Sequence, residues 1–253
     1  MEKYKINQME EITNFVYTKS YNRLLERFSK LKEGKGHIIH VIAAPGTGKS
    51  TNIYKSIQEL DLNVYEAKLP LPSMNMSSRE VYNFMLECVR KDLQIKSSEP
   101  VGRYLEKFDA VLFADQFHDI HQIHRDKVGF SQWTNHMGLK SLKFYLICIY
   151  EYFKHRRDFK NINIILQTAW RIHLGGEKKD LFTDVGCLSA LAVNILRVPF
   201  EVVKISYSEE ETISIVKSHI SDVNSDEIKH YIKKYGNRPR FICQNIKKDL
   251  KMD

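Results

Sequence analysis

The stretch "AAPGTGKST" (43–51) joins two segments of contrasting pattern. Before it, "HIIHVIAA" (37–44) is a short β-branched run that is typical of a buried strand. After it, "KSTNIYKSIQEL" (49–60) favours a helix. The connecting residues follow the pattern G-x-x-x-x-G-K-[ST], with the small residue Ala43 in place of the first glycine. The sequence therefore predicts a strand, a glycine-containing loop and a helix in direct succession.

The chemistry of this loop suits a nucleoside triphosphate. Gly46 and Gly48 allow backbone N–H groups to turn inwards around a phosphate, and the positive N-terminus of the following helix points at the same anion. The ammonium group of Lys49 can reach the outer phosphates, and the hydroxyl group of Ser50 can ligate Mg²⁺. We predict that seven consecutive residues contact the nucleotide: Pro45, Gly46, Thr47, Gly48, Lys49, Ser50 and Thr51.

Strands and helices alternate along the rest of the chain. Apolar residues recur at helical spacing in 19–33, which predicts an amphipathic helix. Further strands are predicted at 62–69, 109–115, 161–169 and 200–206, and further helices at 77–93, 139–156 and 183–196. Beyond residue 207 only helices are predicted, at 209–220, 225–235 and 238–250.

This alternation implies an α/β fold with a parallel sheet that has helices on both faces. We expect a five-stranded parallel sheet of the P-loop NTPase type, followed by a small C-terminal helical lid. The expected division is a core with an N-terminal helix at 1–206 and a lid at 207–253.

Polar residues at the ends of two other strands add to the predicted site. Asp115 ends the run "DAVLFAD" (109–115), and ligands bind at the carboxyl ends of parallel strands. We therefore predict that Asp115 holds Mg²⁺ through water, together with Ser50. Gln167 and Thr168 end another apolar run, and we expect them to lie close to the γ-phosphate.

Two arginines occur where helix electrostatics disfavours them. In "GNRPR" (236–240), Gly236 ends one helix and Pro239 suits the first turn of the next. Arg238 and Arg240 then lie at a helix N-terminus, whose dipole opposes positive charge. A nearby anion would remove this conflict, and the γ-phosphate is the candidate.

Taken together, these motifs resemble those of the AAA+ ATPases and of their relatives, the STAND-type signalling ATPases. "APGTGKS" (44–50) resembles their Walker A loop, "VLFAD" (111–115) the Walker B strand, "ILQTA" (165–169) sensor 1 and "GNRPR" the sensor 2 turn. The resemblance runs from about residue 19 to the C-terminus. Because the sequence ends at Asp253, we expect the core of the origin-recognition relatives without their winged-helix domain.

The resemblance implies ATP and Mg²⁺ as cofactors, and assembly into rings or filaments. It favours Arg240 as the sensor 2 residue, since the family commonly has arginine just after the proline. The catalytic set that the motifs and the resemblance together predict consists of Lys49, Asp115, Gln116, Thr168 and Arg240.

Gln116 stands where the family usually has glutamate. Glutamine can hold a water molecule but cannot accept its proton, and the loss of a general base typically costs about 10²- to 10⁴-fold in rate. We therefore expect slow hydrolysis, with ATP acting mainly as a conformational ligand that closes the lid. The alternative is that another acid, such as Asp119, accepts the proton.

The segment after Gln116 leaves several interpretations open. The loop at 125–138 is basic at its start and contains Phe130 and Trp133, so it could stack on nucleic acid, contact a neighbouring subunit or pack on its own domain. Three histidines precede it and could form a metal site or a solvated helix face: His118, His121 and His124. Candidates for an arginine finger are Arg156, Arg157 and Arg171.

Composition narrows the class of protein further. The 253 residues are 43% hydrophobic and 28% charged, as in soluble globular proteins, and no apolar run approaches the roughly 18 residues of a membrane span. No secretion signal is evident, and the four cysteines form no CxxC pair, so we expect reduced thiols and a cytoplasmic location. The net charge of +8 is compatible with contact to DNA but does not require it.

Three functions are compatible with these features. The first is an ATPase or ATP-dependent switch that acts on DNA or on a protein partner, which could be a second copy of the chain. The second is a signalling or toxin–antitoxin-like interaction module in which the nucleotide is structural. The third is a small-molecule phosphotransferase, which the Asp at one strand end and the sensor-like strand argue against.

Overall fold

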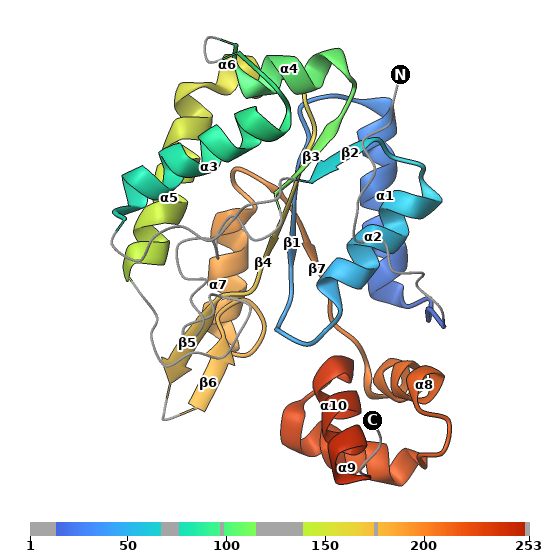
Figure 1. Ribbon diagram of the computed structural model, residues 1–253. Helices are drawn as coiled ribbons and strands as arrows, with labels where there is room; N and C mark the ends of the chain where they lie inside the picture. Colours follow the sequence, from blue (N-terminus) through green and yellow to red (C-terminus); the bar gives the residue numbers. More distant parts are fainter. Residues whose placement is uncertain (1–13, 67–75, 97–98, 115–138, 175–176, 251–253) are drawn as a thin grey trace.

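The computed structural model describes residues 14–66, 76–96, 99–114, 139–174 and 177–250. Its central sheet consists of five parallel strands in the order β2-β3-β4-β1-β7 (Figure 1). Their bounds are Ile38–Ile42 (β1), Val64–Glu66 (β2), Val111–Ala114 (β3), Ile164–Thr168 (β4) and Glu201–Lys204 (β7). The prediction of an α/β fold with a five-stranded parallel sheet is confirmed.

Helices cover both faces of the sheet (Figure 1). One face is covered by α1 (Lys19–Glu33) and α2 (Lys49–Glu59), and the other by α3 (Ser78–Asp92), α4 (Val101–Lys107), α5 (Leu139–Lys154) and α7 (Cys187–Leu196). Alternate residues of β1 face the two layers: Ile39 and Val41 join the cluster of α1 and α2, whereas Ile42 packs with α7. Burial on both faces explains why β1 is apolar except for His40.

Several element boundaries differ from those predicted. The helix predicted at 19–33 is confirmed, and the Thr18 side chain caps it by accepting from the Tyr21 N–H. The helix predicted at 139–156 ends at Lys154 and is followed by α6 (Arg156–Phe159). An antiparallel hairpin of β5 (Arg171–Leu174) and β6 (Glu177–Asp180), which was not predicted, follows β4.

The helix predicted at 183–196 begins four residues late, at Cys187. Residues 180–184 form instead a turn, here called the carboxylate turn, in which the Asp180 carboxylate accepts from the Phe182 N–H at 3.0 Å and from the Thr183 hydroxyl at 3.1 Å. Such side-chain to backbone bonds compete with helix formation. Gly186, with a φ of +51°, then directs the chain into α7.

The C-terminal part of the described chain is helical, as predicted. It consists of α8 (Glu209–His219), α9 (Ser225–Tyr235) and α10 (Pro239–Asp249). These helices share a hydrophobic cluster whose buried members all lie beyond residue 207: Val216, Ile220, Val223, Ile228, Tyr231, Ile242 and Ile246. The domain boundary between residues 206 and 207 stays a prediction.

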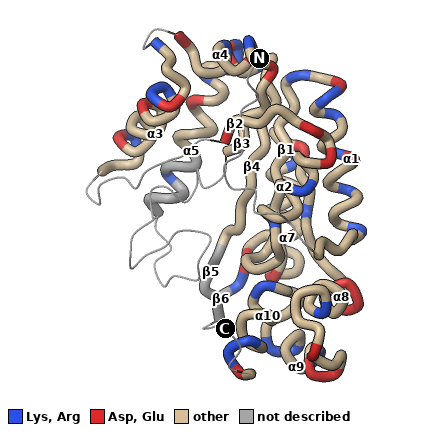
Figure 2. The backbone as a smooth tube through the Cα atoms, turned by 45° about the vertical axis from the view of Figure 1, so that its right-hand side comes forward, with Lys and Arg blue, Asp and Glu red and all other residues tan. Residues whose placement is uncertain are grey.

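Charged residues of both signs are mixed on the surface. Figure 2 shows Lys and Arg together with Asp and Glu on α1, α3 and α9. Over the residues that the structure describes, no helix combines the length and the apolar character needed to cross a membrane.

Candidate functional site

The glycine loop (43–50) connects the end of β1 to the start of α2 at the carboxyl edge of the sheet. Gly46 and Gly48 have φ angles of +84° and +76°, a left-handed conformation that is unfavourable for residues with a Cβ atom. Gly48 is also the N-cap of α2, so the loop leads directly into N–H groups that have no intrahelical partner. The two glycines thus provide the tight turn that the motif requires.

Lys49 and Ser50 at the start of α2 make different contacts, Lys49 with the backbone of the loop and Ser50 with Gln167 of β4. The Nζ atom of Lys49 donates to the carbonyl oxygens of Ala43 at 2.9 Å and of Ala44 at 3.4 Å. The Oγ atom of Ser50 lies 3.4 Å from Oε1 and 3.2 Å from Nε2 of Gln167. The structure therefore places an ammonium group and a hydroxyl at the start of α2, with the hydroxyl beside an amide from the adjacent strand end.

The remaining residues of the predicted contact set differ in exposure. Pro45 and Thr47 are buried, and the Thr47 hydroxyl donates to the Ala44 carbonyl oxygen at 2.8 Å. The Thr51 side chain is exposed on the first turn of α2. The buried members shape the loop, whereas Thr51 faces outwards.

Thr168 is not brought together with Ser50 and Gln167. Its Oγ1 atom lies 2.7 Å from Nε2 of His40 on β1, and both side chains are buried. Neighbouring strand residues point to opposite faces of a sheet, so Gln167 faces α2 and Thr168 faces away from it. The catalytic role predicted for Thr168 therefore lacks support from its described contacts.

The predictions for Asp115 and Gln116 fall outside the described residues, as do those for 125–138 and for the three histidines of 118–124. The last described residue before them is Ala114, which ends β3 and pairs with Leu166 of β4. β3 therefore ends at the same edge of the sheet as β4 and β1.

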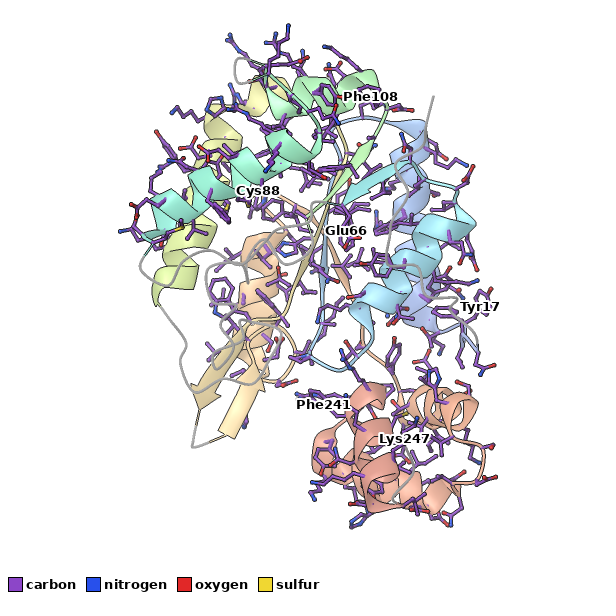
Figure 3. All side chains as sticks on the ribbon, viewed as in Figure 1. Tyr17, Glu66, Cys88, Phe108, Phe241 and Lys247 are labelled. Carbon is purple, nitrogen blue, oxygen red and sulfur yellow. The ribbon has the colours of Figure 1, made fainter. Side chains whose placement is uncertain are left out.

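The N-terminus of α10 contacts the glycine loop. The backbone N–H of Arg240 donates to the Gly46 carbonyl oxygen at 3.0 Å. The ring of Phe241, which Figure 3 labels at the end of α10 nearest this loop, lies so close that a Cβ atom added to Gly46 would be 3.0 Å from it. The C-terminal helices thus touch the turn that the two glycines make.

A second set of contacts connects the same parts. The Asn52 side-chain amide donates to the Gly48 carbonyl oxygen and to the Tyr207 hydroxyl, both at 2.8 Å. The Asn237 amide in turn donates to the Tyr207 carbonyl oxygen at 3.0 Å. Hydrogen bonds therefore lead from the glycine loop through Tyr207 to the turn between α9 and α10.

The two arginines of that turn have different surroundings. The Arg240 side chain, predicted as the sensor 2 residue, is exposed. The Arg238 side chain is only 16% exposed, and its guanidinium forms an ion pair with the Asp184 carboxylate. Among these two, Arg238 is the arginine that connects α10 to the core.

The sequence prediction missed the carboxylate turn. Asp180 is fully buried, and burial raises the pKa of its carboxyl to about 6, with a further raising effect of Asp184 and a lowering effect of Lys49. The Asp180 N–H donates to Asp184 Oδ2 at 2.9 Å, so Asp184 holds both this amide and Arg238. The two aspartates in "DLFTDVG" (180–186) could have indicated this turn, but the helix predicted at 183–196 included the second of them.

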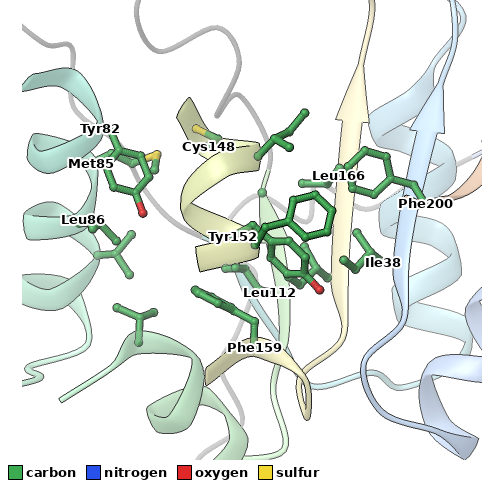
Figure 4. Close-up of a pocket in the computed structure, with 16 residues that line it drawn as sticks. Ile38, Tyr82, Met85, Leu86, Leu112, Cys148, Tyr152, Phe159, Leu166 and Phe200 are labelled. Carbon is green, nitrogen blue, oxygen red and sulfur yellow. The ribbon is translucent and has the colours of Figure 1, made fainter. Parts of the chain in front are cut away.

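A cavity of about 130 Å³ lies on the face of the sheet that α3 and α5 cover, between these helices and the sheet (Figure 4). Its lining is apolar and aromatic, and includes Leu112, Tyr152 and Phe159. It lies opposite α2, so it takes no part in the site at the glycine loop.

Comparison with known proteins does not identify a family: the chain matches no family model and no curated protein. Within the described part of the chain, no group of three or more His, Cys, Asp and Glu side chains is arranged to hold a metal ion. A function for this chain therefore has to be inferred from its local geometry and its motifs.

Proposed function

We propose that this chain is a Mg²⁺-dependent ATP-binding protein of the AAA+ type, which acts on DNA or on a protein partner as a slow ATPase or as an ATP-driven switch. The observation that carries the proposal is the left-handed turn at Gly46 and Gly48, with Lys49 and Ser50 directly after it at the carboxyl edge of a parallel sheet. Ligands of open α/β sheets bind at this edge. The ammonium group of Lys49 and the N-terminus of α2 add the positive potential that a triphosphate needs.

The donor set suits a magnesium ion. The Ser50 hydroxyl and the Gln167 carbonyl oxygen are neighbouring oxygen donors, and Mg²⁺ prefers oxygen ligands. We expect Ser50 to ligate the ion directly and Asp115 to hold it through water. Bound Mg²⁺ would neutralise negative charge on the phosphates.

The C-terminal helices are proposed to act as a lid that responds to the nucleotide. The Arg240 N–H and the Phe241 ring both contact Gly46, so a change in the loop is transmitted directly to α10. Bound phosphate would interact with the N–H groups around the same turn. The nucleotide would therefore bind with different affinity when α10 contacts the glycine loop and when it does not.

Hydrolysis is proposed to be slow because Gln116 cannot accept a proton. A missing general base typically lowers the rate by about 10²- to 10⁴-fold. ATP would then remain bound long enough to serve as a conformational ligand.

Calorimetric titration of the protein with ATP and Mg²⁺ tests the proposal. We expect Lys49→Ala to weaken ATP binding by about tenfold or more, because the charge-assisted bonds of the ammonium group to the phosphates are lost. The matched control is Lys32→Ala, since Lys32 is an exposed lysine on α1, away from the glycine loop. Equal ATP affinity of all three proteins, or no binding by the native chain, would reject the proposal.

The contact of α10 with Gly46 also favours a second candidate, an interaction module in which ATP is held with little turnover. Single-turnover hydrolysis separates the two, because the module would retain ATP unchanged. Light scattering after size exclusion, with and without ATP and with duplex or single-stranded DNA, identifies the kind of partner.

A further inference from the structure

Near the glycine loop, one buried carboxylate oxygen has no hydrogen-bond partner within the described part of the chain. Asp180 is 0% exposed, and its Oδ1 atom accepts from Phe182 and Thr183, whereas Oδ2 has no hydrogen-bond partner among the residues that the structure describes. A buried polar atom without a partner loses its hydration and gains nothing in exchange. A ligand that donates a hydrogen bond to this oxygen would explain why it is buried without a protein donor.

Two cations, Lys49 and Arg238, lie near Asp180 together with a second carboxylate, Asp184. Lys49, at the start of α2, is close enough to lower the pKa of the Asp180 carboxyl. Asp184 accepts from the Asp180 N–H and pairs with Arg238, the N-cap of α10. Asp180 therefore belongs to a cluster that also contains a cation from the loop helix and a cation from the C-terminal helices.

The position of the carboxylate turn is fixed by its packing. The Leu181 N–H donates to the Trp170 carbonyl oxygen at 2.6 Å, and Phe182 packs against Ile42, the last residue of β1. Ile42 immediately precedes the glycine loop. Asp180 is thus held beside the strand end from which the glycine loop begins.

We infer that the Oδ2 atom of Asp180 is the proton acceptor for nucleotide hydrolysis at this site, the role that Gln116 cannot fill. This inference rests on the ATP site of the proposed function and replaces its expectation of slow hydrolysis, because Asp180 supplies the general base that Gln116 does not. The oxygen of a water molecule forms a bond to the γ-phosphorus, and the bond from the γ-phosphorus to the β–γ bridging oxygen breaks. ADP leaves with that electron pair, and the proton of the water passes to Asp180 Oδ2 and later to solvent.

Asp184 cannot take this role in the same way. Its Oδ1 atom shares the single hydrogen of the Thr183 hydroxyl with Asp180 Oδ1, at 2.7 Å and 3.1 Å, and its Oδ2 atom accepts from the Asp180 N–H and pairs with Arg238. Both oxygens are therefore engaged, and Asp184 is a positioning residue that orients Asp180 and Arg238.

The ionisation of Asp180 fits a base that works near neutral pH. Burial raises the pKa of its carboxyl to about 6, so it is mostly ionised at neutral pH and still accepts a proton readily. The charged groups that the structure places around it are Lys49 from α2 and Asp184 from its own turn, and beyond Asp184 lies Arg238 from α10.

The test compares Asp180→Asn with the native protein in single-turnover ATP hydrolysis, with ATP affinity measured on the same samples. We expect Asp180→Asn to bind ATP at least as tightly and to hydrolyse it about 10²-fold more slowly or worse. The matched control is Asp222→Asn, the same change at an exposed position, with an unchanged rate. An unchanged rate in Asp180→Asn, or ATP binding by the native chain without any hydrolysis, overturns the inference and leaves the proposed function standing.

The second measurement is the pH profile of the hydrolysis rate of the native protein. It tests the inference even when Asp180→Asn does not fold. We expect the rate to rise about tenfold per pH unit below about pH 6 and to level off above it, since only the ionised carboxylate accepts the proton. The ATP γ-phosphate also ionises near pH 6, so the rate is measured with saturating ATP and Mg²⁺, and the ATP affinity is measured at each pH. A flat profile of the saturated rate across this range overturns the inference. Failure to bind ATP in the native protein, by contrast, rejects the proposed function itself.

Discussion

Arg238 and Asp184 form an ion pair although they lie 54 residues apart in the chain. Arg238 caps α10, and Asp184 belongs to the carboxylate turn before α7. The pair therefore joins the C-terminal helices to the core, next to the contact between Gly46 and α10.

Asp184→Asn removes the negative charge and keeps the shape of the side chain. Because the pair is mostly buried, we expect the free energy of unfolding to fall by about 1–3 kcal/mol. Hydrogen exchange in α10 should become faster, since this helix loses its charged contact with the core. Urea denaturation and amide exchange measure both effects, and unchanged exchange in α10 would show that the pair does not hold the helices.

Gly46→Ala should destabilise the protein more than the same change at another left-handed glycine. At Gly48, with a φ of +76° and a ψ of +34°, an added Cβ atom makes only ordinary contacts, at 3.8 Å or more, so Gly48→Ala has only the backbone cost of about 1–2 kcal/mol. At Gly46 the Cβ atom also meets the Phe241 ring. Urea denaturation of both variants checks this order, and equal losses would contradict a tight contact between Phe241 and the loop.

Asp180 should make stability depend on pH in a defined direction. The pKa of its carboxyl is raised from 3.8 to about 6 in the folded protein, so its contribution to stability is fully present below about pH 4 and is lost as the pH rises through about 6. The native protein should therefore lose on the order of 3 kcal/mol relative to Asp180→Asn across this interval. Urea denaturation of both proteins at a series of pH values tests this prediction. If the free energy of unfolding changes with pH equally in the two proteins, the burial of an ionised Asp180 is contradicted.

Thr168→Val should affect stability and leave ATP binding unchanged. The Thr168 hydroxyl is buried against His40, so its removal costs about 1–3 kcal/mol. The hydroxyl faces away from Ser50, and the affinity for ATP should stay within about twofold of the native value. A large loss of affinity in calorimetry would instead support the sensor role that the motif suggested.

Much of the fold was accessible from local sequence patterns. Residues 37–44 form a β-branched run because β1 is buried on both faces, and 19–33 show helical spacing because α1 buries one stripe on the sheet. The glycine motif also predicted the turn at Gly46 and Gly48, whose left-handed conformation only glycine adopts at low cost. Periodicity failed at 183–186, where side-chain hydrogen bonds from Asp180 decide the local conformation.

The candidate site was predicted only in part. Lys49, Ser50 and Gln167 follow from the loop and from a strand end, and their positions relative to each other depend on the parallel pairing of β1 and β4. The side of the sheet that Thr168 faces depends on register, because a shift of one residue reverses every side chain. Which of the two arginines, Arg238 or Arg240, contacts the core depends on how α10 packs against it.

By itself the sequence determined the chain order of the five sheet strands and of the longer helices, the glycine turn and the chemistry of Lys49 and Ser50. These properties are local, since backbone preference and side-chain type act over a few neighbouring residues. Only the tertiary structure decided that Asp180, Asp184 and Arg238 lie together beside the loop. Contacts between distant segments follow from how the layers pack, and short sequence patterns do not encode them.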